Sequence, residues 1–323
     1  METETRSILV VGYHGAELLE IASVTSALTA ACVESGGTPY DVRLLTPGGR
    51  AITCATGLRL EAQGVLELHR EPADTLVVSG GFGAMEAAGD LHLVRHVQRL
   101  ATLVRRVAAV CTGAGILAAA GLLDGRRATT HWGFADELAR RHPEVKVDPR
   151  PLFVRDGSVY TSAGITAALD LTLAFIAEDL GGAVARDVAR ALVAYLQRPA
   201  NQAQISVHVA APAPADPVLR GILDHIGSRL DGDLTAPGLA AEAGISARHL
   251  RRLFRTHLGQ SPAQYVRRTR AEAAAHLLTS TALPLAGVAK RCGFGTTESM
   301  RTAFLDFYGV PPSRFSTTPR SVW

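Results

Sequence analysis

The chain has 323 residues, of which 47% are hydrophobic, and a formal net charge of +3, so it is long and apolar enough for two buried cores. Its acidic start lacks the basic region and cleavage site of a secretory signal, and no apolar run approaches the roughly 20 residues that span a bilayer. Four scattered cysteines, without a Cys-x-x-Cys pair, argue against a zinc site and a disulfide framework. We expect a cytoplasmic protein with no metal, no cofactor and no membrane partner.

Residues 6 to about 180 alternate between short β-branched runs and amphipathic helical stretches, which is typical of a parallel sheet covered by helices. The expected strands are residues 7–13, 40–47, 74–81 and 106–112. The expected helices follow Glu17, Leu91, Gly113 and Gly133, and two more cover Ala167–Leu180 and Ala183–Leu196. The sequence thus predicts an α/β first domain.

The segment AAVCTGAGILAAAGLL predicts a strand that runs through Cys111 into a glycine-rich helix. A thiol at a helix N-terminus is exposed to backbone N–H groups and to the helix dipole, both of which stabilise a thiolate. The small residues Gly113, Ala114 and Gly115 allow the backbone to pass close to it. We therefore expect a lowered pKa at Cys111.

Two further residues fit the chemistry of an acid-assisted cysteine nucleophile. Glu20 lies just beyond the first strand, and His131 follows a strand-like segment twenty residues after the cysteine. Each also has a structural interpretation, because a buried cysteine is commonly a small apolar residue, and a single His or Glu is commonly structural. The coincidence of the three favours a functional site.

Residues 198–216 contain prolines and alanines without periodicity and predict a linker. We therefore expect a first domain over residues 1–197 and a second over 217–323. In the second, residues 216–323 hold 14 Lys and Arg against 8 Asp and Glu, so the positive charge is concentrated there. A concentrated basic segment indicates a phosphate-binding surface, although a solvated helix surface is the alternative for an isolated run.

A helix-turn-helix pattern occurs twice in this domain, over Leu239–Tyr265 and Val288–Phe315. Each copy has a short apolar helix, a turn glycine, a hydroxyl cap and a phenylalanine at the same distance from the cap; these residues are Gly244, Ser246 and Phe254, then Gly293, Thr296 and Phe304. A helix from about Pro262 to Leu278 joins the copies. Two such units predict an all-α reader of double-stranded DNA.

A recognition helix presents hydrogen-bonding side chains from its N-terminal turns to the major groove. The candidates for DNA contact are Arg248, His249, Arg251, Arg252 and Arg255 in the first copy and Thr296, Thr297, Glu298, Arg301 and Thr302 in the second. Arginine can read guanine or hold a phosphate, so the sequence leaves both roles open. Glu298 can accept from a cytosine amino group or simply favour the helix dipole.

The stretch from about Leu219 to Arg320 resembles the DNA-binding domain of AraC/XylS transcriptional regulators, most closely in CGFGTTESMRTAFLDFYGVPPSRF. That resemblance implies two helix-turn-helix units in successive major grooves. By position it places DNA contacts at Arg248, Arg251 and Arg252, then at Thr297, Glu298, Arg301 and Thr302. RNA polymerase is a possible further partner.

Residues 6 to about 180 resemble the ThiJ/PfpI branch of the class I glutamine amidotransferase-like superfamily, through LVVSGGFGA, AAVCTGAG, GLLDGRRATTHW and TSAGITAALDLTL. The resemblance implies a flavodoxin-like doubly wound sandwich. It places the elbow cysteine at Cys111, the acid at Glu20 and the histidine at His131, with the amides of Gly80–Gly83 facing the pocket. The ligand-site candidates are Glu20, Gly81, Phe82, Cys111, Thr112 and His131.

Together the two domains resemble GlxA-type regulators. The resemblance implies a homodimeric, sequence-specific regulator that is not an enzyme and whose first domain senses a small metabolite, such as an amino acid, a betaine or an amide. Two alternatives stay open. One is a cysteine-dependent hydrolase or isonitrile hydratase-like enzyme tethered to a DNA-binding domain, with Glu20, Cys111 and His131 as its triad-like candidates. The other is a redox sensor based on the Cys111 thiol.

Overall fold

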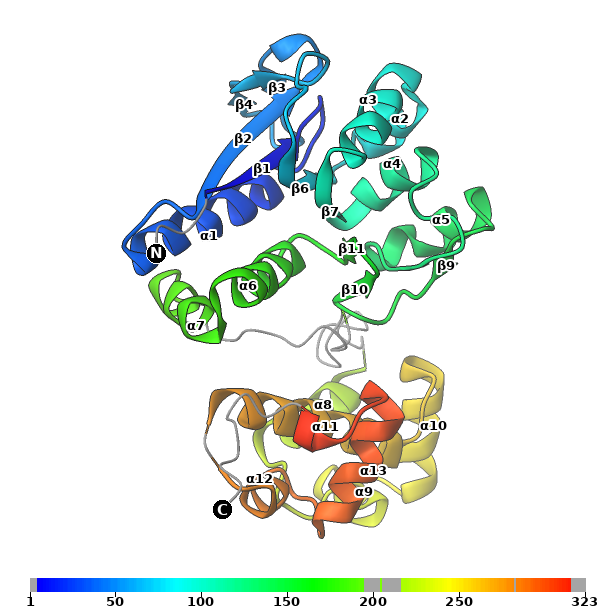
Figure 1. Cartoon of the computed structure of the whole chain (residues 1–323). Coiled ribbons are helices and arrows are strands. Elements are labelled where there is room, and N and C mark those ends of the chain that lie inside the picture. The colour runs from blue at the N-terminus through cyan, green and yellow to red at the C-terminus, as the bar shows by residue number, and fades with distance from the viewer. Residues whose placement is uncertain (1–4, 195–203, 205–215, 282, 315–323) are drawn as a thin grey trace. The chain divides into compact units, whose positions relative to one another are not determined.

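The computed structural model describes residues 5–194, 204, 216–281 and 283–314, which form two compact units, Met1–Gln204 and Ile205–Trp323 (Figure 1). Asp216 caps the first helix of the second unit. The predicted linker 198–216 falls almost entirely outside the described residues, so the predicted domain limits stay a prediction.

A seven-stranded sheet forms the centre of the first unit, in the order β10-β11-β7-β6-β1-β2-β5. Its strands are β1 (Arg6–Val11), β2 (Tyr40–Thr46), β5 (Gly64–Val65), β6 (Ala73–Val78), β7 (Val104–Ala109), β10 (Phe153–Asp156) and β11 (Val159–Ser162). All neighbours pair in parallel except β10 with β11. Two small ladders lie outside this sheet and join β3 (Ile52–Thr53) to β4 (Arg59–Leu60) and β8 (Arg127–Ala128) to β9 (Lys146–Val147).

Helices cover both faces of the sheet (Figure 1). One face carries α1 (Leu18–Ser35), α6 (Ala167–Leu180) and α7 (Gly182–Ala191), and the other carries α2 (Ala84–Gly89), α3 (Leu91–Ala101), α4 (Ala114–Ala119) and α5 (Ala135–Arg141). The strands are buried on both sides, which explains their continuous apolar runs. The predicted flavodoxin-like doubly wound fold is confirmed.

Two helical predictions need adjustment. The helix expected over Ala183–Leu196 ends at Ala191, and residues 195 and 196 lie outside the described part of the chain. Helix α1 has the length and apolarity of a membrane span, with a mean hydropathy of 1.3 over 18 residues, contrary to the expectation that no such run exists. Because Ile21, Val24 and Leu28 are buried in the core of the first unit, we assign α1 to that core.

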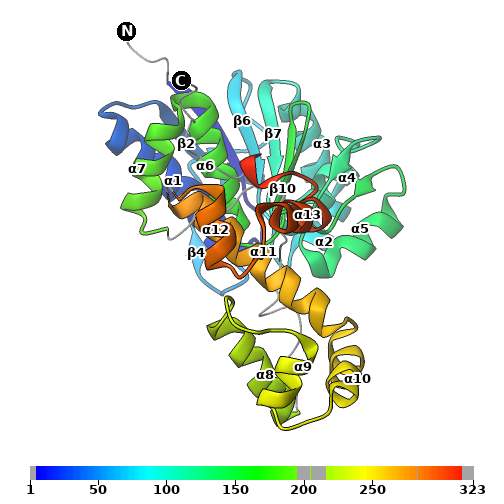
Figure 2. The ribbon, with the colours of Figure 1, turned by 90° about the horizontal axis from the view of Figure 1, so that it is seen from below.

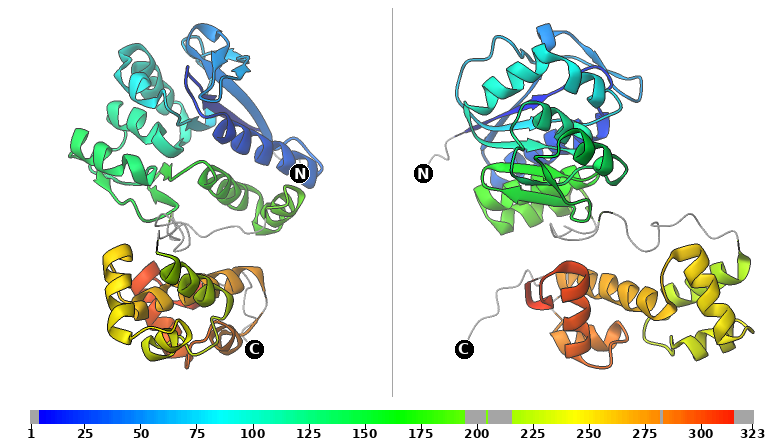
Figure 3. Two further views of the ribbon diagram at one scale, coloured as in Figure 1. Left: turned by 180° about the vertical axis from the view of Figure 1, so that it is seen from behind. Right: turned by 90° about the vertical axis from the view of Figure 1, so that its right-hand side faces the viewer.

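The second unit contains six α-helices among its described residues: α8 (Pro217–Ser228), α9 (Ala236–Glu242), α10 (Ala247–Leu258), α11 (Pro262–Ser280), α12 (Leu285–Arg291) and α13 (Thr297–Tyr308). They form two clusters with separate cores, around Phe254 and around Phe304, and α11 runs from one cluster to the other (Figures 2 and 3). The predicted caps are confirmed, since Ser246 accepts from the His249 amide and Thr296 from the Ser299 amide.

A buried ion pair holds the amino ends of the sheet strands to α6. Arg106 on β7 is 2% exposed, and its guanidinium donates to both carboxylate oxygens of Asp179 and lies 4.1 Å from the centre of the Phe175 ring. Asp74 and Glu178 also face this guanidinium. Removing one partner of such a buried pair lowers the stability of the fold, because the other charge then stays buried without a partner.

Replacing Asp179 with Ala is expected to lower the free energy of unfolding by about 3 kcal/mol, because the Arg106 charge then stays buried without its closest partner. Urea denaturation measures this change. The matched control is Glu137→Ala, which removes the exposed pairs with Arg140 and Arg141 and should leave the midpoint unchanged. Equal losses in the two variants would contradict a special role for the buried pair.

Candidate effector site and DNA-binding surface

Cys111 occupies the predicted turn between β7 and α4 and has a φ of 52°, in the left-handed region that non-glycine residues rarely adopt. This turn is possible because Gly80 and Gly113 have no side chain, so the backbone segments around them can approach closely. A Cβ on Gly113 would lie 2.6 Å from the Ser79 carbonyl oxygen, and one on Gly80 would lie 2.8 Å from the Thr112 amide. The elbow is therefore held by close packing, and only 7% of Cys111 is exposed.

Glu20 projects from the first turn of α1 into the same place and is fully buried. Its Oε2 accepts a hydrogen bond of 2.7 Å from the Gly80 amide. A Cβ on Gly80 would lie 2.9 Å from this oxygen and 2.9 Å from the Cys111 Cβ, so the two side chains flank one glycine. Its other oxygen, Oε1, has no hydrogen-bond partner in the part of the chain that the structure describes. The predicted association of Glu20 with Cys111 is thus present.

The pKa shift of Cys111 is opposite to the sequence prediction, and that of its neighbour Glu20 is large. Burial raises the pKa of Glu20 to about 7. Burial, followed by the neighbouring Glu20 charge, raises the pKa of the Cys111 thiol well above its ordinary value, where a lowered pKa was expected. Loss of solvation therefore outweighs the hydrogen bonds from Thr112, which lower the pKa, and the protonated thiol is favoured at neutral pH.

His131 lies beside the elbow but does not complete a triad. The preceding residue, Thr130, donates its hydroxyl proton to the Cys111 carbonyl at 2.8 Å. The His131 ring accepts from the Gly133 amide through Nδ1, and burial lowers its pKa. Within the described residues no hydrogen bond joins His131 to Cys111 or Glu20.

The amides of the glycine loop after β6 are engaged within the protein. Those of Gly80, Gly81 and Gly83 donate to the Glu20 carboxylate, the Thr112 hydroxyl and the Gly15 carbonyl. Gly83 also lines an open cavity of this unit, so the expected role of this loop at a ligand pocket stays a prediction. Phe82, at the tip of the loop, is 91% exposed.

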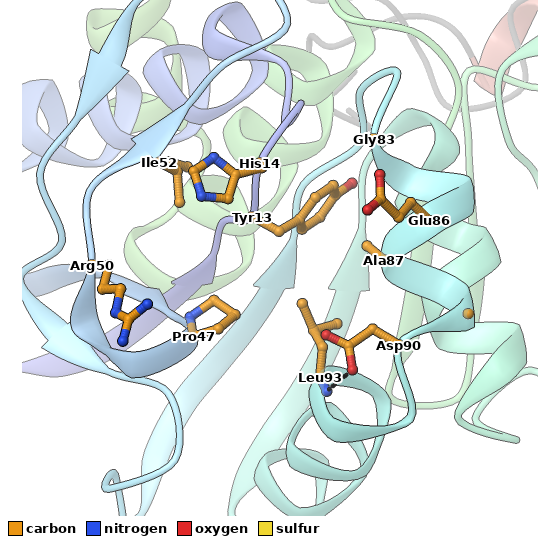
Figure 4. Close-up of a pocket in the computed structure, with 11 residues that line it drawn as sticks. Tyr13, His14, Pro47, Arg50, Ile52, Gly83, Glu86, Ala87, Asp90 and Leu93 are labelled. Carbon is orange, nitrogen blue, oxygen red and sulfur yellow. Dashed lines mark hydrogen bonds between the residues drawn. The ribbon is translucent and has the colours of Figure 1, made fainter.

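An open cavity of about 530 Å³ lies next to this closed centre, at the carboxyl ends of β1 and β2 (Figure 4). Tyr13 lines it, donates its hydroxyl proton to the Ser79 carbonyl at 2.7 Å and has a raised pKa through burial and the charge of Glu20. Arg50 and His14 approach from one side, and Glu86 and Asp90 from the other (Figure 4). Sequence reasoning missed all of these cavity residues. The carboxyl ends of parallel strands were the available signal.

Gln204, the last residue of the first unit, is hydrogen-bonded to the strand segment that precedes His131. Its side-chain amide donates to the Thr129 hydroxyl at 3.0 Å, to the Thr130 carbonyl at 2.8 Å and to the Pro151 carbonyl at 3.2 Å. Thr130 in turn bonds Cys111. A short chain of hydrogen bonds thus connects the elbow with the point where the chain leaves this unit.

In the second unit, α10 and α13 present the predicted side chains but differ in charge. The α10 candidates Arg248, Arg251, Arg252 and Arg255 are exposed, and His249 is half-buried. The described residues provide no ion pair for these arginines, so their charge is available to phosphates or bases.

On α13 the candidates Thr297, Glu298, Arg301 and Thr302 are exposed, but Arg301 pairs with Glu298 at 3.0 Å. The Thr296 hydroxyl accepts from the Ser299 amide as the helix cap. The first recognition helix is therefore strongly cationic and the second nearly neutral.

Comparison with known proteins agrees with both units. The DJ-1/PfpI family matches residues 6–178, and a helix-turn-helix domain matches residues 239–318. The chain belongs to the DJ-1/PfpI family and carries an AraC-type helix-turn-helix domain, which makes it a DNA-binding transcriptional regulator with a DJ-1/PfpI sensing domain.

Three individual matches are informative. The HTH-type transcriptional regulator GlxA of Rhizobium meliloti is 31% identical, with 96% of each chain covered. The isonitrile hydratase of Pseudomonas putida is 35% identical over 44% of this chain and 65% of its own. A ThiJ/PfpI family structure from Pseudomonas syringae, 22% identical, covers 75% of this chain and 92% of its own with a TM-score of 0.55, which supports the fold.

The pH dependence of stability should report the buried Glu20. Its pKa of about 7, against an ordinary 4.5, means that the folded state holds the proton more tightly than the unfolded state. This contribution is complete below about pH 4.5 and is lost as the pH rises through about 7. Relative to Glu20→Gln, wild type should lose up to about 3 kcal/mol of unfolding free energy between pH 4 and 8.

Denaturant titrations at several pH values measure that difference. Glu34→Gln, on the exposed surface of the same helix, serves as the control and should follow wild type throughout. A constant difference between Glu20→Gln and wild type across this range would show that the pKa of Glu20 is the same in the folded and unfolded states.

Proposed function

We propose that the first unit senses a small zwitterionic or amide-bearing metabolite that binds in the cavity between Arg50 and Glu86. This proposal rests on the distribution of charge in that cavity. The Arg50 guanidinium lies on one wall, and the Glu86 and Asp90 carboxylates lie on the other (Figure 4). A ligand with both a carboxylate and a cationic nitrogen, such as an amino acid or a betaine, matches this arrangement. Apolar contact comes from Ile52 and Leu93.

Tyr13 connects this cavity with the ligand site that the sequence predicts. The residues of that predicted site are Glu20, Gly81, Phe82, Cys111, Thr112 and His131. The Tyr13 ring lines the cavity, and its hydroxyl bonds Ser79, at the end of β6 next to the Gly80 amide that Glu20 binds. A ligand that displaces this ring alters the packing of the elbow. The bonds from Cys111 through Thr130 to Gln204 then offer a route to the chain segment that leads to the DNA-binding unit.

Such a ligand changes DNA binding only if its affinity differs between two arrangements of the regulator. We further propose that the regulator is a homodimer in the cytoplasm, with RNA polymerase as a possible further partner. The side chains proposed to contact DNA are Arg248, His249, Arg251, Arg252, Arg255, Thr296, Thr297, Glu298, Arg301 and Thr302. The exposed, unpaired arginines of α10 support the last point.

A thermal-shift screen of amino acids, betaines, amides and nucleobases on the full chain tests the effector proposal. An effector at about 100 times its Kd stabilises the folded state by about 2.7 kcal/mol. We expect the resulting rise in Tm to disappear in Arg50→Ala and in Glu86→Gln. It should persist in Arg59→Ala, which removes an exposed arginine from β4. A rise that survives both cavity changes would place the effector elsewhere.

A cysteine-dependent hydrolase is the second candidate, because the Glu20 and Cys111 pair is retained and an isonitrile hydratase matches this unit. Three observations favour a binding role over turnover: the raised thiol pKa, the glycine-loop amides engaged within the protein, and the absence of a bond from His131 to Cys111 among the described residues. The raised pKa also disfavours the redox sensor, since the thiolate is the form that is oxidised.

Alkylation by iodoacetamide at pH 7 distinguishes these roles. We expect Cys111 to react at least about tenfold more slowly than free cysteine, because both its thiolate fraction and its exposure are low. Site-resolved mass spectrometry measures the rate, and the chain unfolded in urea gives the unprotected reference. A Cys111 rate above that of free cysteine would instead support the enzyme or the redox sensor.

A further inference from the structure

The two helix-turn-helix turns are alike in sequence and backbone but differ in what surrounds them. Gly244 and Gly293 occupy the same position, with φ values of 64° and 72°. A Cβ on Gly244 would meet no atom within 4 Å. A Cβ on Gly293 would lie 2.0 Å from the Leu230 carbonyl oxygen and 2.8 Å from Nε of Arg270. Of these two glycines, Gly293 alone has backbone of another segment packed against its Cβ position.

That contact joins the two helix clusters. Leu230 follows α8 and packs against the first core, whereas Gly293 lies between α12 and α13 of the second cluster. Arg270, near the middle of α11, donates from Nε to the Leu230 carbonyl at 2.9 Å and from Nη2 to the Gly232 carbonyl at 3.2 Å. The turn after α8, the middle of α11 and the turn before α13 therefore meet at one point.

Helix α11 alone is a weaker connection. Its first turns pack in the first core through Tyr265 and Val266, and its later turns pack in the second through Ala274 and Leu278. A single helix between two small cores can bend or twist between them. The Arg270 hydrogen bonds cross the junction, and a charged donor to a carbonyl contributes more than a neutral one. A further link, Arg267 to Asp306 at 2.7 Å, is solvent-exposed on both sides and is weaker for that reason.

We propose that Arg270 and Gly293 form a spacing junction that fixes the distance and angle between the recognition helices α10 and α13. The proposal rests on two-groove DNA recognition. Successive major-groove faces are about 10 base pairs apart, so one added base pair moves the second half-motif by about 3.4 Å and turns it by about 35°. A junction held by these contacts cannot adjust the distance and angle between the two recognition helices to match that change. The pair thereby positions both helices, and the regulator reads the spacing of its site as well as its bases.

Selection from a random DNA library by the full-length protein tests this junction. Wild type and Gly244→Ala should recover two half-motifs at one fixed separation. Arg270→Met, which keeps the side-chain length and removes the donors, should recover the same half-motifs at several separations. Gly293→Ala should do the same, because its methyl group must push the Leu230 carbonyl away. Gly244→Ala carries the same backbone strain without the contact and is thus the matched control.

Affinity measurements on the selected site give a second readout. One base pair inserted between the half-motifs should weaken wild-type binding at least about tenfold, but Arg270→Met binding less than about threefold relative to its own uninserted site. Thermal unfolding checks each variant. Should Gly293→Ala unfold, Arg270→Met carries the test, since it leaves the glycine in place.

The outcomes separate the junction from the recognition mode. A single separation and an unchanged insertion penalty in Arg270→Met would overturn the junction while leaving two-groove recognition intact. Equal broadening in Gly244→Ala and Gly293→Ala would also overturn it, because backbone strain would then be the cause. If wild type selects no paired half-motifs, two-groove recognition fails and the junction falls with it.

Discussion

The close approach of backbones at the carboxyl ends of β1, β6 and β7 is the constraint on which the first unit depends. A Cβ on Gly81 would lie 2.3 Å from the Gly15 carbonyl oxygen, and one on Gly83 would lie 2.1 Å from that of His14. This packing buries Glu20 completely. The carboxyl group loses its solvation, and its pKa rises as a consequence. Sealing the site thus determines both its shape and its electrostatics.

The same close packing bears on whether this unit binds a ligand or catalyses a reaction. An enzyme of this architecture would need free amides and an ionised thiol at the elbow. Here the amides are engaged by protein groups, and the thiol is protonated. The open volume lies on the far side of Tyr13, where charged side chains face one another across a cavity. These features support the proposed role of the cavity in ligand binding.

Sequence patterns predicted the parts of the structure that depend on neighbours along the chain. The positions of β1, β2, β6 and β7, the Cys111 turn and the caps at Ser246 and Thr296 all follow from local periodicity and hydrogen-bonding residue types. The predicted direction of the Cys111 pKa shift was wrong, because burial by distant segments is the largest contribution to that shift. The helix dipole is visible in sequence, whereas the degree of burial is not.

The cavity and the spacing junction were missed for a related reason. Arg50 follows β2 and Glu86 lies on α2, so they line one cavity only when β1, β2 and α2 are in place. In the sequence Arg270 is only one of the 14 basic residues counted in the second domain, but its guanidinium is turned inward to two carbonyl groups. Charge counts along the chain cannot distinguish an arginine that holds protein from one that holds DNA.

That distinction changes how the basic second unit is understood. The helix-turn-helix repeat suggests two equivalent readers, yet α10 is strongly cationic and α13 has its arginine paired with Glu298. Electrostatic attraction to phosphates is then concentrated on the first reader. The second adds little charge, and its contribution depends on arriving at the correct place on the DNA. Rigid spacing therefore matters most for the weaker reader, and the contact that supplies it is found at the turn of that reader, Gly293.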